Sequence, residues 1–191
     1  MTEVGVDLMK KTPDLSVHWA VAEEDGLTDP RWKAFPTIWQ GQGSLGQRLH
    51  KVYSSLQSQH QTVFLMGADS PHISSNNILQ NVNETLRLSN KQFTIGRTAD
   101  GGFYFFGGAQ EIPQTVWDKV TYSEPTTADQ LISTLKPIGP TRILVPDFDI
   151  DRAIDFAPFL NADFNTVPLL TSQIRLIQWV RKTLEEHDEH V

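Results

Sequence analysis

Short runs rich in β-branched and aromatic residues alternate along the chain with longer segments whose apolar residues have helical spacing. This alternation is typical of parallel strands covered by helices, because each strand and helix bury their apolar sides against one another. We therefore predict an α/β fold with a mostly parallel sheet. The expected strands are 15–22, 35–40, 62–66, 92–96, 102–107 and 141–145, and the expected helices are 2–11, 171–186 and three that begin near residues 45, 75 and 127.

Length and composition narrow the class of protein. A chain of 191 residues is of ordinary size for one domain. It has no cysteine, which excludes disulfides, thiolate zinc sites and a cysteine nucleophile. The net charge of −7 argues against binding to nucleic acid or to an anionic membrane. The sequence shows no secretory leader and no apolar run long enough to span a bilayer, so we expect a cytoplasmic protein.

The segment 62–66 has no charged residue and is expected to be a central parallel strand buried on both faces. Asp69 follows it after Gly67 and Ala68, whose small size lets the phosphates of a ligand approach the backbone, and Ser70-Pro71 fixes the turn. Ligands of open α/β sheets gather beyond the carboxyl ends of the strands, so this carboxylate suits Mg²⁺ or Mn²⁺ bound with a diphosphate. Alternatively, Asp69 only caps the turn.

A second acidic group follows the expected strand 141–145. Asp149 and Asp151 are two residues apart, so in an extended segment they face the same way and could share one cation. The alternative is an exposed acidic loop in which Asp151 or Asp155 caps a short helix.

The segment Ala99-Asp100-Gly101-Gly102 allows a tight turn with exposed backbone donors, and a plain hairpin turn explains it equally well. His72, directly after the turn at Asp69, is the histidine best placed to contribute to a site. A loop histidine with a local hydrogen bond remains the simpler interpretation.

Four motifs resemble those of a known family and occur in the same order along the chain. They are Gly-Ala-Asp-Ser-Pro at 67–71, Ala-Asp-Gly-Gly-Phe-Tyr at 99–104, a Ser/Thr-rich helix start, and Asp-Ile-Asp at 149–151. The family is the glycosyltransferase-A-like one catalogued as domain of unknown function 2064. The similarity covers roughly residues 40–156 and includes Gln-Gly-Ser-Leu-Gly-Gln-Arg at 42–48, which is similar to the family's Gly-Asp-Leu-Gly-Glu-Arg.

The resemblance implies one domain over residues 1–191 with the three-layer α/β/α fold of nucleotide-diphospho-sugar transferases. It further implies transfer from a nucleotide-activated sugar, with Mg²⁺ or Mn²⁺ held on the diphosphate by Asp69 and the site completed by Asp149 or Asp151. Asp100 would be the catalytic residue, acting as a base or positioning a hydroxyl. The implied substrate-binding residues are Gly67, Ala68, Ser70, Pro71, His72, Gly101, Gly102, Ser123 and Thr127.

The sequence departs from the family pattern at its start. Related chains begin with an additional strand and a basic Pro-Gly-x-x-Lys-Thr-Arg loop that receives the nucleotide phosphates. This sequence starts after that element, and Lys10-Lys11-Thr12-Pro13 has a similar composition but precedes a strand. A misplaced start, a site completed by a partner subunit, and loss of activity each explain the departure. It predicts an exposed edge beside the strand 62–66, which a homodimer would cover.

Two other functions compete with the glycosyltransferase hypothesis. A nucleotidyltransferase of the same fold would join a nucleotide to a phosphorylated small molecule, but it needs the basic phosphate loop. A non-catalytic binding or scaffold protein would keep the fold alone.

Overall fold

The computed structural model describes residues 1–88, 91–162 and 168–188. Contacts group the chain into two compact units, which are described separately below. The first unit comprises Met1–Asp14, Ala68–Leu79 and Asp149–Val191, and the second comprises Leu15–Gly67 and Gln80–Phe148. A single domain over residues 1–191 stays a prediction.

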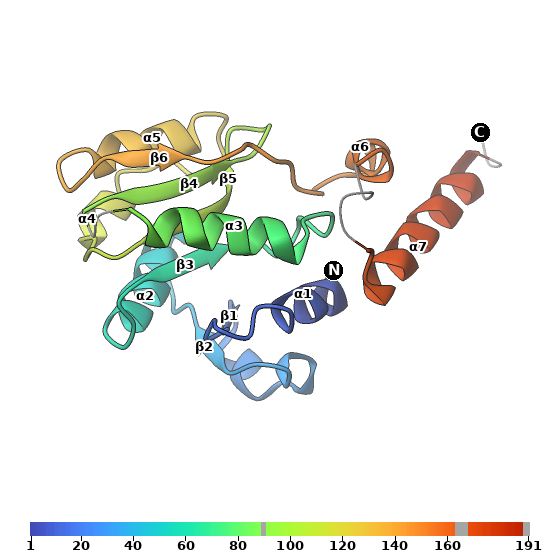
Figure 1. Ribbon diagram of the computed structural model, residues 1–191, viewed down its shortest axis with the longest axis horizontal. Helices are drawn as coiled ribbons and strands as arrows, with labels where there is room; N and C mark the ends of the chain where they lie inside the picture. The colour runs from blue at the N-terminus through green and yellow to red at the C-terminus, as the bar shows by residue number, and fades with distance from the viewer. Residues whose placement is uncertain (89–90, 163–167, 189–191) are drawn as a thin grey trace. The chain divides into compact units, whose positions relative to one another are not determined.

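The second unit carries the strands, in two sheets (Figure 1). The smaller sheet pairs β1 and β2 in parallel, and the larger has the order β3-β5-β4-β6. In the larger sheet β4 and β6 are parallel, whereas β5 is antiparallel to both β3 and β4. The α/β class is confirmed, and its parallel character is partial. The strands are β1 Trp19–Val21, β2 Thr37–Trp39, β3 Val63–Met66, β4 Phe93–Arg97, β5 Phe103–Gly108 and β6 Thr141–Ile143.

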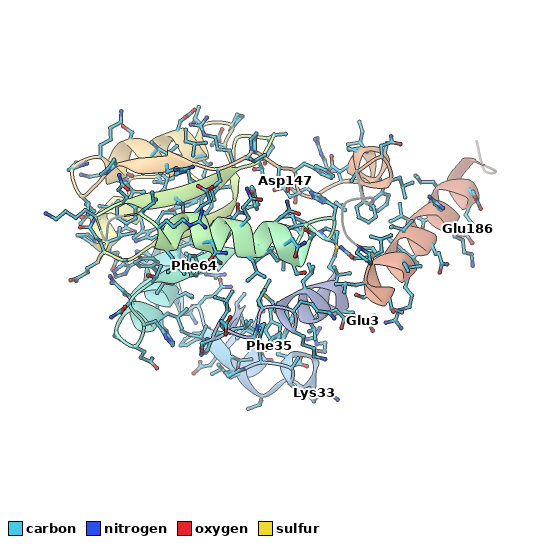
Figure 2. The ribbon with its side chains drawn as sticks, viewed as in Figure 1. Glu3, Lys33, Phe35, Phe64, Asp147 and Glu186 are labelled. Atoms are coloured by element: carbon cyan, nitrogen blue, oxygen red, sulfur yellow. The ribbon has the colours of Figure 1, made fainter. Side chains whose placement is uncertain are left out.

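The position of β3 differs from the expectation for the strand 62–66. Instead of lying centrally among parallel strands, β3 is an edge strand of the larger sheet and runs antiparallel to β5. Phe64, Leu65 and Met66 are accordingly only half-buried (Figure 2 labels Phe64). The chain folds back between β4 and β5, and this return inserts β5 between β3 and β4. The sequence prediction missed this pairing because an apolar run does not specify which strands lie beside it. β3 is thus the last strand on one side of the larger sheet, and exposure of its free edge stays a prediction.

One face of the larger sheet packs against α2 Leu45–Gln57, α4 Gln114–Trp117 and α5 Thr127–Leu135. Helix α2 begins at Ser44, as expected, in a capping box with Gln47. The buried residues of this core come from strands, helices and connecting loops: Tyr53, Val63, Phe93, Ile95, Phe106, Ile112, Trp117, Val120, Ala128, Leu131 and Leu135.

The other face of the larger sheet contacts the C-terminal half of α3 (Ser75–Leu86) through polar groups. Thr85 Oγ1 lies 2.7 Å from Thr94 Oγ1 of β4, and both side chains are buried. Asn81 Nδ2 donates to Tyr104 Oη of β5 at 3.2 Å. Helices therefore cover both faces of this sheet within the second unit.

The first unit is helical, with α1 Thr2–Met9, α6 Phe156–Leu160, α7 Thr171–Asp188 and the N-terminal turn of α3. Helices α1 and α7 contact each other, and each buries an apolar stripe that includes Val4 and Leu8 of α1 and Val180 of α7. Gln173 Nε2 donates to the carbonyl oxygen of Pro71 at 2.9 Å, which fixes α7 to the loop after Asp69.

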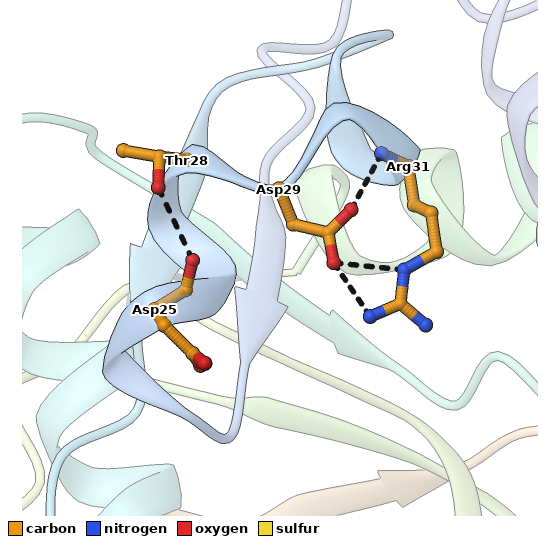
Figure 3. Close-up of polar contacts among 4 residues, drawn as sticks. All are labelled: Asp25, Thr28, Asp29 and Arg31. Carbon is orange, nitrogen blue, oxygen red and sulfur yellow. Dashed lines mark hydrogen bonds and ion pairs between the residues drawn. The ribbon is translucent and has the colours of Figure 1, made fainter.

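Two short 3₁₀ helices, η1 Glu24–Thr28 and η2 Pro30–Trp32, connect β1 to β2 (Figure 3). The carboxylate of Asp29 accepts hydrogen bonds from the backbone N–H of Arg31 at 2.8 Å and from its Nε at 2.8 Å. These hydrogen bonds and the guanidinium charge lower the pKa of Asp29. Arg31 is exposed and Asp29 is half-buried, so this surface pair contributes little to stability, and its role is to shape the loop.

Candidate functional site

The turn after β3 is held by backbone hydrogen bonds on both sides of Asp69. Within the second unit, Gly67 N–H donates to the carbonyl oxygen of Tyr104 at 3.0 Å, at the end of the β3–β5 ladder. Within the first unit, Ile150 N–H donates to the carbonyl oxygen of Asp69 at 3.0 Å. The second bond joins two segments about eighty positions apart in sequence, and it places the residues on either side of Ile150 beside Asp69.

Asp69, Asp149 and Asp151 form a three-carboxylate cluster in the first unit. One oxygen from each side chain can be chosen such that all three lie within 4.8 Å of one another. Asp69 and Asp149 are half-buried and Asp151 is exposed. A divalent cation bound among the three carboxylates would balance their negative charge. Carboxylate oxygens are the ligands that Mg²⁺ prefers, so these three side chains could together hold one such ion.

Asp155 shapes the loop that carries Asp151. Its Oδ2 accepts hydrogen bonds from the N–H groups of Asp151, at 3.1 Å, and of Arg152, at 2.8 Å, at the start of η3 Ala153–Asp155. The capping role that the sequence allowed for Asp151 or Asp155 thus falls to Asp155. The Asp151 side chain instead lies in the cluster.

The other residues predicted around Asp69 mainly support the loop. Ser70 and Pro71 are buried, and the Ser70 carbonyl oxygen accepts a hydrogen bond from Ile73 N–H at 3.2 Å. Ala68 is exposed and His72 is half-buried. Substrate binding by these residues stays a prediction, and the buried pair has a clear structural role in fixing the turn.

Asp100 lies in the second unit, in the turn between β4 and β5. Its Oδ1 accepts hydrogen bonds from Gly102 N–H at 3.0 Å and from the hydroxyl of Thr98. Gly101 has φ +95°, and a Cβ there would lie 1.9 Å from the carbonyl oxygen of Pro125. The hairpin-turn interpretation of this sequence therefore describes the local structure, and the exposed carboxylate is held in a fixed orientation.

Ser123 and Thr127 lie at the start of α5. The Thr127 hydroxyl is buried and lies 2.8 Å from the Glu124 carbonyl oxygen and 3.0 Å from that of Thr121, so it holds the helix start. Ser123 is exposed with φ +61°, an uncommon conformation for a residue with a side chain. Ala128 N–H donates to the Gly101 carbonyl oxygen at 2.9 Å, which joins the start of α5 to the Asp100 turn.

No pattern in the sequence indicates the role of Tyr104. Its hydroxyl donates to the carbonyl oxygen of Val145 at 3.0 Å and accepts from Asn81, so it fixes the segment that leads from β6 towards Asp149. Burial is the main cause that raises the pKa of Tyr104, and the charge of Asp147 adds to it. The phenol is therefore neutral at ordinary pH and can donate this hydrogen bond.

The family described as "Uncharacterized protein conserved in bacteria (DUF2064)" matches residues 8–124, and the chain belongs to this family. The match begins earlier and ends earlier than the expected range of 40–156. Asp69, Asp100 and Ser123 lie inside the matched residues, whereas Thr127, Asp149 and Asp151 lie outside them. The family match therefore does not bear on Asp149 and Asp151, and their assignment to a site rests on their proximity to Asp69.

The fold is similar to the crystal structure of the "putative nucleotide-diphospho-sugar transferase" from Desulfovibrio desulfuricans G20, with a TM-score of 0.71 and 16% identity. The alignment covers 95% of this chain and 84% of that chain. This likeness confirms the predicted fold type. No curated protein matches the sequence. In the part of the chain that the structure describes, no helix is both long enough and apolar enough to cross a bilayer.

Proposed function

We propose that this protein is a metal-dependent transferase that uses a nucleotide-activated sugar, with Asp69, Asp149 and Asp151 as the ligands of one Mg²⁺ or Mn²⁺. The observation that supports this most is the convergence of the three carboxylates from two segments far apart in sequence. Local turn chemistry accounts for the capping group of Asp155 but not for this convergence.

In the proposed sugar transfer, different residues of the chain would have different roles. A bound divalent cation would act as a Lewis acid on the leaving diphosphate. Asp69, supported by the buried Ser70-Pro71 turn, would orient that ion, and Asp149 and Asp151 would balance its charge. Asp100 is proposed to position or deprotonate the acceptor hydroxyl, with Gly101 and Gly102 in the same turn, and Ser123 is proposed as a further substrate contact of the second unit.

Binding of Mn²⁺ and nucleotide sugars, measured by thermal shift and calorimetry, tests the proposal. A ligand at about 100 times its Kd should add about 2.7 kcal/mol to the free energy of unfolding. Asp69→Asn should abolish the part of this stabilisation that depends on Mn²⁺. Asp14→Asn is the control because Asp14 is also a loop aspartate of the first unit, although more exposed than Asp69, and lies outside the cluster. An equal response of wild type and Asp69→Asn would exclude the metal site.

The same measurements separate the competing functions. Stabilisation by a nucleoside triphosphate together with a sugar phosphate, but not by nucleotide sugars, would favour a nucleotidyltransferase. Metal binding without any nucleotide response would favour a non-catalytic protein. Product analysis with a panel of nucleotide sugars and Mn²⁺ then identifies the sugar.

The location and assembly of the protein belong to the same proposal. We propose a cytoplasmic protein that forms a homodimer through the exposed edge of β3, where Phe64 and Met66 are half-buried. Light scattering after size-exclusion chromatography measures the mass directly. A dimer that Phe64→Lys converts to a monomer would support this interface, and a monomeric wild type would exclude it.

A further inference from the structure

The loop that carries Asp69 is attached to the start of α7 by the side chain of Gln173. This residue is 4% exposed and lies at the third position of the helix, 102 positions from Pro71 in sequence. Its Nε2 donates to the carbonyl oxygen of Pro71 at 2.9 Å and to that of Ile73 at 3.5 Å. All of these residues belong to the first unit, so the attachment is internal to it.

The same side chain also caps α7. Gln173 Oε1 accepts a hydrogen bond at 3.0 Å from the N–H of Leu170, the residue before the helix. The amide thus has its oxygen against a donor and its nitrogen against two carbonyl oxygens. Turning it over would place oxygen against oxygen, so these partners fix its orientation. One buried amide therefore performs two separable tasks, of which only the donor task concerns the Asp69 loop.

The Asp69 loop has a second attachment, to the segment 149–151 that carries the other two carboxylates. Ile150 N–H donates to the carbonyl oxygen of Asp69 at 3.0 Å. That bond holds the loop at Asp69 itself, whereas Gln173 holds it two residues further on, at the buried Pro71. Because the loop is held at both points, the backbone of Asp69 has little freedom to move relative to the segment 149–151.

The rigidity of a carboxylate site affects the divalent cations differently. Mg²⁺ requires a nearly ideal octahedron of oxygens at about 2.0–2.1 Å, whereas Ca²⁺ accepts about six to eight oxygens at about 2.3–2.6 Å in flexible arrangements. A site whose ligands are free to shift therefore loses more affinity for Mg²⁺ than for Ca²⁺. Groups that orient a metal ligand without touching the ion commonly contribute about 10- to 100-fold in metal affinity.

We propose that Gln173 is a positioning residue for the three-carboxylate cluster and raises its affinity for Mg²⁺ relative to Ca²⁺. It acts through the carbonyl oxygen of Pro71 on the backbone that carries Asp69, and it does not touch the ion. The inference rests on the proposed function, because it takes the three carboxylates as the ligands of the ion. Gln173 lies outside residues 8–124, so the family match does not bear on it.

Calorimetric titration of the full chain with Mg²⁺ and with Ca²⁺ at pH 8 tests the proposal through the ratio of the two Kd values. Gln173→Ala should weaken Mg²⁺ binding about tenfold and Ca²⁺ binding by less. Gln173→Glu keeps the acceptor for Leu170 N–H but loses the donor to Pro71, so the cap remains and the ratio should still change in the same direction. The charge that Gln173→Glu adds attracts both ions, so the ratio is compared and not either affinity alone.

Gln57→Ala is the matched control. Gln57 Nε2 also donates to a carbonyl oxygen distant in sequence, that of Ala109 at 3.2 Å, but within the second unit. Thermal unfolding with a chelator measures the structural cost of each variant, and Gln57→Ala should leave the ratio of Kd values unchanged even where it lowers stability. Gln173→Glu keeps the test decisive if Gln173→Ala folds poorly.

Three outcomes would overturn the proposal. Unchanged ratios in both Gln173 variants, with a wild type that binds Mg²⁺, would remove the role of Gln173 and leave the metal site intact. A change in Gln173→Ala but not in Gln173→Glu would assign the effect to the helix cap. A wild type that binds neither ion would overturn the metal site of the proposed function as well.

Discussion

The two groups of aspartates predicted from the sequence differ in how their positions are determined. Asp100 is oriented by donors within two residues of itself, Thr98 and Gly102. Asp69 lies instead against Asp149 and Asp151, about eighty positions away, through the backbone bond to Ile150. The turn at Asp100 is built from contacts between neighbouring residues, whereas the three carboxylates come together only when two distant segments meet. Local turn contacts therefore account for the position of Asp100, whereas tertiary contacts account for the three-carboxylate cluster.

The largest expected effect comes from breaking the Asp100 turn at Gly101. Gly101→Ala combines a positive φ with a Cβ placed 1.9 Å from a backbone oxygen, so it should cost about 3 kcal/mol in urea unfolding. The matched control is Gly5→Ala, inside α1, which should gain about 0.5–1 kcal/mol. If the folded variant binds Mn²⁺ as the wild type does, the two aspartate groups act separately. An unchanged unfolding free energy would contradict the described turn.

The second prediction concerns the sign of an effect at the three-carboxylate cluster. Without metal, Asp149→Asn should raise the free energy of unfolding by about 1 kcal/mol, and with it the melting temperature, because it removes one of three neighbouring charges. With saturating Mn²⁺ the order should reverse, since the wild type gains about 2.7 kcal/mol at 100 times its Kd and the variant gains little. Thermal unfolding of both proteins, once with a chelator and once with Mn²⁺, measures the two stability differences. A variant less stable than wild type in both conditions would point to a structural role.

A smaller effect separates the two possible roles of Asp100. Asp100→Ala should cost about 1 kcal/mol, because Gly102 N–H and the Thr98 hydroxyl lose their acceptor. Asp100→Asn keeps an oxygen at this position and should be nearly neutral for stability. If Asp100→Asn unfolds like the wild type but loses transferase turnover, the carboxylate is catalytic. Full turnover would restrict Asp100 to the turn.

The smallest effect is expected at Asp29, a half-buried carboxylate near the surface that lies in neither group and serves as a baseline. Its pKa is lowered from 3.8 by hydrogen bonds from Arg31, so its stabilising contribution is present above about pH 3.8 and is lost as the pH falls through the lowered pKa. The difference in melting temperature between wild type and Asp29→Asn should thus be small at pH 6 and vanish near pH 2. A constant difference across this range would exclude the ion pair as its cause.

The sequence by itself determined most of the local structure. Ser44 predicted the start of α2 and Ser74 or Ser75 that of α3, because capping depends on residues within one turn. The spacing of apolar residues likewise predicted α7 and its stripe at Ile177 and Val180. Placing Asp69 directly after a strand needed only the end of an apolar run.

Only the tertiary structure decided which distant segments meet. The apolar run of β3 gives the same signal for a central and an edge strand, so its antiparallel pairing with β5 came from the return of the chain after β4. The sequence also does not show that the carbonyl oxygens of Thr121 and Glu124 lie around the buried hydroxyl of Thr127, because that arrangement forms only when the loop folds back before α5. The hydrogen bond from Ile150 to Asp69, which brings the three carboxylates together, joins backbone atoms that every residue carries, so no side-chain pattern encodes it.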